Sequence, residues 1–337
     1  MNKILDSDAP IATIFGGSGF IGRYVVRRLV NKGWRVRVAV RYPNQALHLK
    51  TYGEVGQVEL LSCSIFNRDS VVSSISGATA VISTVAGFLN ETSRKRLAEY
   101  YINGPEIIAK ACENLGIKNL IHISSIGADN EAESLYSRYK AKGEEKVLEW
   151  FPNAVIFRLS LVFGNEDRFF NRYAAMSSYS VILPIIGQNT RFQPVYVDDV
   201  AKAVEKVLTE KKVKGVFEIG GPEILTHREN IEKMLKVIRR KRVLLTLPFK
   251  LAIFMGSMFG YIEILSFGLL KPPFTVDNVK QLKVDNVVGK RSKGLESLNI
   301  NPTTLDSIIP SYLYPYRPYG QYNEVTEVSK KMNKKSP

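Results

Sequence analysis

A tyrosine and a lysine lie four positions apart in this sequence, at Tyr136 and Lys140. On a helix, side chains at that spacing lie one turn apart on the same face. A phenol with a pKa of about 10 is a poor proton donor or acceptor at neutral pH, but a neighbouring ammonium stabilises its phenolate and shifts that pKa toward neutrality. Tyr136 and Lys140 are therefore candidate catalytic residues for exchanging a proton with a carbonyl or an alcohol. The same spacing also arises often by chance.

Two serines precede this pair and end an apolar run that is typical of a buried strand. A hydroxyl at the end of that strand can hydrogen-bond the same oxygen as the tyrosine, and Ser125 is the better candidate. The alternative is that Ser124 and Ser125 only satisfy backbone groups where the strand ends.

A glycine-rich turn lies near the start of the chain, between an expected strand and an expected helix. Its glycines have separate mechanical tasks: one permits a tight turn, one lets the backbone approach a pyrophosphate, and one allows the helix to pack closely on the strand. The free N–H groups and the positive dipole at the helix start suit a phosphate anion. We predict dinucleotide binding here, the alternative being an ordinary strand–helix turn. The candidate cofactor-binding residues are Gly16, Gly17, Ser18, Gly19, Phe20, Ile21 and Gly22.

The end of the second expected strand bears on the choice of nucleotide. Arg41 lies 19 positions beyond Gly22, where NAD sites usually place a carboxylate for the ribose hydroxyls and an arginine accommodates a 2′-phosphate. No acidic residue occurs between Asp8 and Glu54. The sequence therefore favours NADP(H) over NAD(H), the alternative for Arg41 being a solvated strand end. Tyr136 and Lys140 are counted among the candidate cofactor-binding residues as well.

Strand patterns alternate with helical patterns through the first half of the chain. An apolar helical face begins near Phe20 and ends before Gly33, where a left-handed cap is expected. This alternation predicts an α/β fold, a Rossmann-type doubly wound parallel sheet with a smaller C-terminal α/β region on the substrate side. The expected strands are Ile11–Phe15, Arg35–Val40, Val58–Leu61, Ala80–Val85, Asn119–Ile123, Ala154–Leu159 and, further along, Val216–Ile219.

The patterns also predict a domain organisation. Residues 1–160, joined by about 195–222, would form the NADP-binding Rossmann domain. Residues 161–194 and 223–322 would form the smaller substrate-side or docking region at the carboxyl ends of the strands. Residues 323–337 lack periodic apolar positions and are expected to be a flexible basic tail.

Composition excludes several classes of protein. The chain has 337 residues with 45% hydrophobic side chains, enough for a substantial core, so bulk disorder is excluded. Cys63 and Cys112 cannot build a disulfide framework, and three scattered histidines suggest no metal site. The net charge of +15 could suit nucleic acid, but the sequence contains no nucleic-acid recognition motif, so no nucleic-acid partner is expected. The first ten residues lack the pattern of a secretion signal.

The basic residues gather in places that suggest surfaces. Between Thr226 and Lys250 lie eight Lys or Arg residues against two acids, including Arg239–Arg242, directly before an apolar stretch, Leu251–Leu270. This apolar stretch contains Glu263 and is expected to be buried or interfacial and not to span a membrane. Basic residues beside an apolar helix suit an anionic membrane surface. The alternative is a solvated basic helix that precedes a core helix.

Two further segments leave alternatives open. Five tyrosines between Tyr312 and Tyr322, kept extended by prolines, are expected to dock on a partner subunit, or else to pack on their own domain. Asp198 and Asp199 are expected either to cap the helix that follows them or to contact a ligand.

Together the glycine turn, Ser125, Tyr136 and Lys140 resemble the short-chain dehydrogenase/reductase superfamily, in its extended or atypical branch. Further blocks are similar to the family of nucleotide-binding accessory subunits of respiratory complex I and their bacterial relatives, over about residues 11–322. The most specific are "EDRFFN" and "QPVYVDDV". One departure is Ser62-Cys63-Ser64, where many relatives have Gly-Asp, so adenine contacts are expected to be weaker or made by the backbone. The blocks are His122–Asp129, Tyr136–Glu144, Phe163–Ala174, Gln193–Ala203 and Thr275–Val288.

The resemblance implies a function. It implies a tightly held NADP(H) with a mainly structural task, in assembly or stability, and complex I partners near the quinone site. It also implies a peripheral position, on the cytoplasmic face of the inner membrane in a bacterium or the matrix side in a mitochondrion. Whether the subunit turns over a substrate stays open. The alternative is an independent NADP-dependent reductase, epimerase or dehydratase that uses Tyr136 and Lys140.

Overall fold

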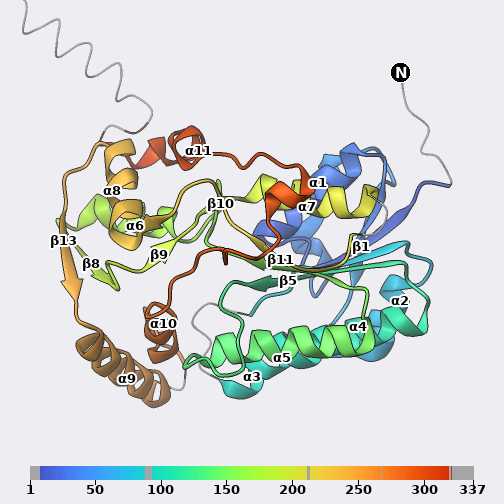
Figure 1. The fold of residues 1–337 in the computed structure, drawn as a ribbon, viewed down its shortest axis with the longest axis horizontal. Coiled ribbons are helices and arrows are strands. Elements are labelled where there is room, and N and C mark those ends of the chain that lie inside the picture. Colours follow the sequence, from blue (N-terminus) through green and yellow to red (C-terminus); the bar gives the residue numbers. More distant parts are fainter. Residues whose placement is uncertain (1–7, 88–92, 211–212, 267, 319, 321–337) are drawn as a thin grey trace, which may run out of the picture.

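A seven-stranded parallel sheet lies at the centre of the protein, in the order β11-β6-β5-β4-β1-β2-β3 (Figure 1). The computed structural model describes residues 8–87, 93–210, 213–266, 268–318 and 320. The predicted fold class is confirmed, and every expected strand is present with its ends moved by two residues at most. The strands are β1 (Ile11–Phe15), β2 (Arg35–Val40), β3 (Val58–Ser62), β4 (Ala80–Ser83), β5 (Asn119–Ser125), β6 (Val155–Leu159) and β11 (Gly215–Ile219).

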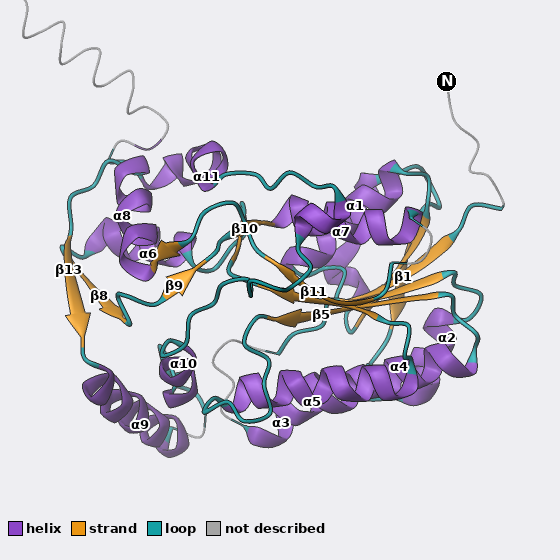
Figure 2. Ribbon diagram, in the orientation of Figure 1, coloured by secondary structure: helices purple, strands orange, loops and turns teal. Residues whose placement is uncertain are grey.

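The central strands β1, β4, β5 and β6 are buried on both faces, which is why they read as nearly continuous apolar runs, whereas the edge strand β3 exposes Glu59 and Ser62. Successive side chains point to opposite faces, so Ile14 joins one apolar core and Phe15 the other. Helices α1 (Phe20–Asn31) and α7 (Val197–Thr209) cover the first face. The other face is covered by α2 (Arg68–Ile75), α4 (Gly104–Asn114) and α5 (Leu135–Trp150), beside α3 (Arg94–Ala98) and a π-helical turn (Glu99–Asn103) (Figure 2).

The strand order sets where a ligand can bind. From β1 the chain moves outward to β2 and β3, then returns to place β4 on the other side of β1. The βα loops after β1 and β4 therefore leave the sheet in opposite directions and open a crevice at the carboxyl ends of the strands. The glycine turn follows β1 at this crevice, and the predicted left-handed cap after α1 is confirmed, since Gly33 has φ +82°.

A third apolar core lies outside the sheet and gathers Phe163, Phe170, Ile185, Met234 and Ile309. The predicted division into two regions stays a prediction. The remaining helices and strands, outside the seven-stranded sheet and its covering helices, are β7 (Val162–Phe163), α6 (Phe170–Tyr179), β8 (Ile182–Ile186), β9 (Arg191–Phe192), β10 (Val195–Tyr196), β12 (Leu225–Thr226), α8 (His227–Val237), β13 (Val243–Leu247), α9 (Phe249–Leu265), α10 (Val276–Gln281) and α11 (Leu305–Leu313). Three 3₁₀ helices cover Pro43–Tyr52, between β2 and β3, and Leu295–Leu298 and Tyr314–Tyr316 near the end of the described chain.

Helix α9 turns an apolar face outward. Its inward positions are Ala252, Gly256 and Glu263, and the Glu263 carboxylate pairs with the Lys271 ammonium at 2.8 Å. Within the described residues, none of the helices combines the length and the apolar content that crossing a bilayer demands. The outward apolar residues of α9 are Leu251, Phe254, Met258, Tyr261, Ile262, Ile264 and Leu265.

Within the basic stretch Thr226–Lys250, the cluster Arg239–Arg242 does not lie beside this face, whereas Lys250 lies in the first turn of α9, so docking on a membrane surface stays a prediction. The cluster links α8 to β13, and the five residues of β13 then separate it from α9 by about 16 Å. Arg240 Nε donates to the Tyr316 carbonyl at 2.7 Å, and Arg242 Nε donates to the Ser177 carbonyl at 2.8 Å. Arg239–Arg242 thus form a turn and a link, in which Arg240 and Arg242 hold neighbouring segments together. The basic residues that precede them in the same stretch, Arg228, Lys233 and Lys236, lie on α8.

The tyrosine-rich segment also differs from its prediction. It is helical where described, since Tyr312 lies in α11 and Tyr314 and Tyr316 form a 3₁₀ turn. Tyr312 is buried and donates its hydroxyl to Asp167 at 2.6 Å, which satisfies the alternative of packing on its own domain. Tyr314 is exposed. Tyr319, Tyr322 and the predicted tail 323–337 lie outside the described residues.

Candidate functional site

The glycine turn forms the start of α1 with its backbone alone. Gly16 has φ +77°, which a residue with a side chain rarely adopts, and its carbonyl accepts from the Gly19 N–H at 2.9 Å. Gly19 is the N-cap residue of α1 and has no side chain that could cap the helix. The first turn of α1, which lies entirely within the described residues, contains no acidic residue. The N–H groups at this helix start are thus left for an external anion.

Two of the glycines are required by close approach. A Cβ at Gly22 would lie 2.3 Å from the Gly16 oxygen, so only glycine lets α1 fold back on the turn. At Gly17 a Cβ would lie 2.7 Å from Val38 of β2. A Cβ at Gly19 would meet only the Gly16 oxygen, at 3.1 Å, so the space outside Gly19 is open to a ligand. Phe20 and Ile21 pack against the apolar core and contribute their N–H groups only.

An arginine braces this turn, and sequence reasoning missed it. Arg23 Nη2 donates to the Ser18 carbonyl at 3.1 Å and Nη1 donates to Glu166 at 3.1 Å. Glu166 also accepts from the Tyr24 hydroxyl at 3.1 Å. The "EDRFFN" block therefore ties the phosphate-binding turn to the C-terminal region. Because Arg23 and Glu166 are 143 positions apart, no local sequence pattern indicated this link.

Arg41 lies where the adenosine half of a dinucleotide would lie in this crevice. It directly follows β2, whose neighbour β1 leads into the glycine turn. The side chain is exposed, and Nη1 donates to the Tyr100 hydroxyl at 3.2 Å. Among the described residues no carboxylate pairs with this guanidinium, so its charge is available to a phosphate.

The three catalytic candidates meet on the other side of the crevice. Tyr136 lies in the first turn of α5, and Ser125 at the end of β5 lies close enough to its phenol to lower the pKa of that group. Lys140 is buried one turn later and donates from Nζ to the Ile123 carbonyl at 3.1 Å. The Tyr101 ring links the two, since it meets the Tyr136 ring edge-on at 5.1 Å and lies 4.9 Å from the Lys140 ammonium.

The expected fall in the tyrosine pKa is not found. Burial raises the pKa of Tyr136, the Asp277 carboxylate raises it further, and only the hydrogen bond with Ser125 lowers it. The Lys140 ammonium is directed to the Ile123 carbonyl and the Tyr101 ring, and burial lowers its own pKa to about 8. In this structure Tyr136 is therefore a neutral hydrogen-bonding phenol at physiological pH.

The other serine has a structural role. Ser124 is buried and donates to the buried Glu144 carboxylate, which Arg158 also binds with two nitrogens, the closer at 2.7 Å. The two serines are thus used differently: Ser124 fixes α5 to the sheet and Ser125 faces Tyr136.

Asp198 and Asp199 neither cap α7 nor face the crevice. Tyr196 is the N-cap residue of α7 and makes no side-chain cap bond, so the capping prediction was wrong. Asp198 binds the Arg28 guanidinium with both oxygens, at 2.7 and 2.9 Å. Asp199 is fully buried and accepts from the Thr303 N–H at 2.6 Å. Both carboxylates hold parts of this chain together.

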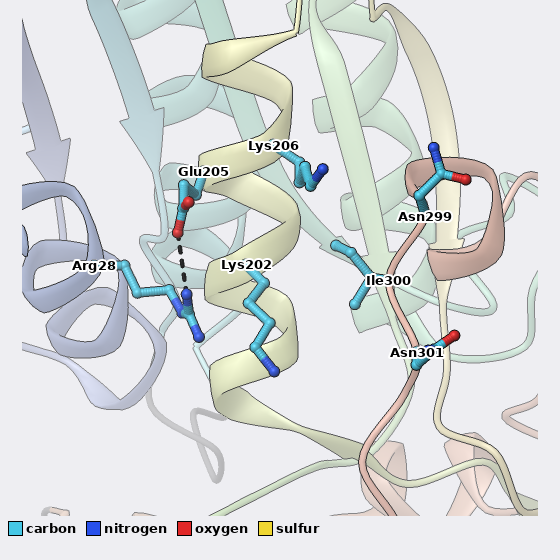
Figure 3. A pocket seen from close by; sticks show the side chains of 7 residues that line it. All are labelled: Arg28, Lys202, Glu205, Lys206, Asn299, Ile300 and Asn301. Carbon is cyan, nitrogen blue, oxygen red and sulfur yellow. Dashed lines mark hydrogen bonds and ion pairs between the residues drawn. The ribbon is translucent and has the colours of Figure 1, made fainter. Parts of the chain in front are cut away.

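A hollow between α1, α7 and residues 299–301 is no candidate for the cofactor (Figure 3). It lies against Arg28, in the last turn of α1, away from the glycine turn. Its cations are already paired, Arg28 with Glu205, Lys202 with Asp199 and Lys206 with Glu210.

The family model of the NAD dependent epimerase/dehydratase family matches residues 12–220. NADH dehydrogenase (ubiquinone) 1 alpha subcomplex subunit 9, mitochondrial, of Mus musculus is 32% identical and covers 95% of this chain and 84% of its own length. The Arabidopsis thaliana protein of that name is also 32% identical, covering 92% and 79%. The structure of Thermus thermophilus UDP-glucose 4-epimerase with NAD is 16% identical, with a TM-score of 0.67, and covers 91% of this chain and 99% of that one.

The match to the epimerase structure shows the fold alone, whereas the other two findings show descent. The family model covers more than half of the chain, and the identity to the mouse protein extends over nearly all of it. The chain therefore belongs to the NAD dependent epimerase/dehydratase family and, within it, to the family of the alpha subcomplex subunit 9 proteins.

Proposed function

We propose that the protein is an accessory subunit of the membrane NADH:ubiquinone oxidoreductase, respiratory complex I. It binds one NADP(H), whose task is mainly structural, and supports assembly or stability of the complex. The observation that carries this proposal is the extent of the similarity. The epimerase family model ends at residue 220, but the similarity to the mouse subunit covers 95% of the chain and so includes the α9–α11 region.

The crevice supports the nucleotide part of the proposal. The turn from Gly16 to Gly22 offers backbone N–H groups to the pyrophosphate. Arg41 receives the 2′-phosphate, and this favours NADP(H) over NAD(H). Ser125, Tyr136 and Lys140 hold the nicotinamide end by hydrogen bonds. When bound, NADP(H) supplies a hydride carrier, and a neutral Tyr136 beside Ser125 keeps proton exchange chemically possible.

The outward face of α9 supports a peripheral position on an anionic membrane surface. Phe254, Tyr261 and Leu265 expose between 67% and 79% of their surface. Exposed lysines, Lys250 and Lys271, flank the face at its two ends, as suits a helix that lies in the lipid headgroup layer. Quinones dissolve in the bilayer, so a subunit at the membrane surface can lie near the quinone-binding region.

The test is a pull-down of the tagged, full-length protein from mildly solubilised membranes, with mass spectrometry of the proteins and of the bound nucleotide. We expect complex I subunits and NADP(H) in the same fraction, with cross-links from α9 to subunits at the quinone-binding region. Recovery exclusively as a free oligomer would contradict the accessory-subunit role. Rapid exchange of bound NADPH for NADP⁺ during turnover of a carbonyl substrate would favour the independent reductase instead.

A further inference from the structure

Asp277 lies on α10 but its carboxylate binds the start of α5. One oxygen accepts from the Leu135 N–H at 2.6 Å, and the other accepts from the Ser134 hydroxyl at 3.0 Å and the Tyr136 N–H at 3.2 Å. Leu135 and Tyr136 are the first two residues of α5. Three donors from the helix that carries Tyr136 thus meet on one carboxylate 141 positions away in the sequence.

This contact has the chemistry of a helix cap supplied from another element. The first N–H groups of a helix have no partner inside it, and the helix dipole favours a negative charge there. Ser134 caps α5 from its own chain segment by accepting from Ser137, and Asp277 satisfies the two N–H groups that Ser134 does not reach. Asp277 also lies close enough to raise the pKa of the Tyr136 phenol.

The other side of α10 is packed against α9, the helix with the outward apolar face. A Cβ at Gly256 of α9 would lie 3.1 Å from the Val276 nitrogen, so the two backbones approach closely there. The Phe259 ring of α9 meets the Phe274 ring edge-on at 5.5 Å. Thr275 and Asn278 close a capping box around the start of α10, which fixes Asp277 in its place. Figure 1 shows α10 beside α9.

We propose that Asp277 is a positioning residue that couples docking of α9 on an anionic lipid surface to nucleotide binding at the Tyr136 side of the crevice. The proposal rests on the proposed function, since it joins the two sites named there. Lipid contact restrains α9, α9 fixes α10, and α10 holds the first turn of α5 through Asp277. By linkage, bound NADPH strengthens lipid docking by the same factor.

The experiment measures the NADPH affinity of the full-length protein with and without vesicles of phosphatidylcholine and phosphatidylglycerol in equal parts. We expect the vesicles to tighten NADPH binding about fivefold or more, the usual lower range of such coupling. Asp277→Asn keeps the size of the side chain but removes its charge, so it should bind NADPH and vesicles and lose the tightening. Glu133→Gln is the matched control, because it removes the 2.8 Å Lys283–Glu133 ion pair near the same helix start and should keep the tightening.

A second measurement uses the unaltered protein alone. Addition of the same vesicles should slow hydrogen–deuterium exchange of the Leu135 and Tyr136 amides, which donate to Asp277. The protein could bind both NADPH and the vesicles while the vesicles change neither its NADPH affinity nor its amide exchange. That result would overturn the coupling and leave the proposed function standing. Coupling that persists in Asp277→Asn would overturn the role of Asp277. Failure of the unaltered protein to bind NADPH or vesicles would overturn the proposed function and this inference together.

Discussion

We expect the choice of nucleotide to depend on Arg41. Its side chain is exposed directly after β2, and no acidic residue occurs between Asp8 and Glu54. Arg41→Glu replaces a cation that can bind the 2′-phosphate with a group that repels it. Since hydrogen bonds to charged groups contribute about 1.5–3 kcal/mol, we expect NADPH affinity to fall roughly 10- to 100-fold and NADH affinity to change little.

Calorimetric titration of both nucleotides tests this. Arg35→Glu, at the other end of the same strand, is the matched control and should leave both affinities nearly unchanged. Equal affinity of the unaltered protein for NADPH and NADH would refute the role given to Arg41.

His227 should make stability depend on pH. Its ring is buried among Phe169, Tyr173 and Phe192, and Nδ1 bonds the Ile186 carbonyl at 2.9 Å. Burial lowers the pKa of His227 to about 4. In the unfolded chain its pKa is about 6.5, so that state takes up the proton first and the free energy of unfolding decreases as pH falls from about 6.5 to about 4, by roughly 3 kcal/mol at most.

His227→Phe removes this titration and should make the slope of the unfolding free energy against pH, measured in urea, shallower over that range, apart from a pH-independent loss caused by the missing Ile186 bond. His122, with its pKa lowered to about 3 by burial, stays in both proteins and contributes to the slope that remains. An unchanged slope in His227→Phe would show that His227 is not the titrating group.

Single residues differ in how far the sequence could predict them. The glycines and the Tyr136–Lys140 pair could be found because their spacing within one segment carries the information. Arg23 with Glu166, and Asp277 with α5, could not, because each pair is more than 140 positions apart and only the fold brings it together. The pKa of Tyr136 was predicted in the wrong direction, because Lys140 donates to Ile123 and burial dominates.

At the scale of elements, prediction was most direct for the central strands β1, β4, β5 and β6, because burial on both faces gives them apolar runs. The edge strand β3 was predicted as well, although Glu59 and Ser62 are exposed. For α9, apolarity alone could not show which face is covered by the chain, and only the small residues Ala252 and Gly256 mark the inward side. The link Arg239–Arg242 misled for a related reason, since closeness in sequence says nothing of the strand between it and α9.

Helix α9 offers a direct test of membrane docking. Phe254→Glu removes an exposed apolar ring and adds a negative charge, so binding to phosphatidylglycerol-containing vesicles should weaken about 10- to 100-fold. Because Phe254 is 67% exposed, the unfolding free energy should change by less than about 0.5 kcal/mol. Co-sedimentation with vesicles and urea unfolding measure the two effects.

The control for this variant is a charge placed on another exposed apolar residue. Val55→Glu, at a side chain that is 97% exposed and far from α9 in the sequence, should leave vesicle binding intact. An equal loss in both variants would indicate non-specific repulsion by added negative charge and would count against α9 as the docking element.

For the whole molecule, the net charge of +15 divides into separate parts. Arg41 faces the crevice, Arg23, Arg28 and Arg158 pair with carboxylates inside the fold, and Lys250 and Lys271 flank α9. In the function proposed above, the nucleotide crevice and the docking face of α9 lie on one chain and are joined through α10. We therefore expect the bound nucleotide to stabilise the folded subunit, whether or not the subunit turns over a substrate.

Two variants, Gly19→Asp and Tyr136→Phe, distinguish a structural cofactor from a catalytic one. Gly19→Asp puts a carboxylate where the pyrophosphate would lie, so it should abolish NADPH binding and reduce the amount of assembled complex I seen in native gels. Tyr136→Phe removes only the hydroxyl that bonds Ser125 and should lower NADPH affinity by no more than about tenfold, leaving assembly and growth intact. If Tyr136→Phe impaired growth while Gly19→Asp left assembly intact, proton exchange at Tyr136 would be the function and the protein would be an enzyme. Loss of assembly in Gly19→Asp but not in Tyr136→Phe would instead mean that the bound nucleotide acts as part of the folded subunit. A ligand that binds only the folded state stabilises that state, so the folded subunit becomes less stable when the nucleotide cannot bind.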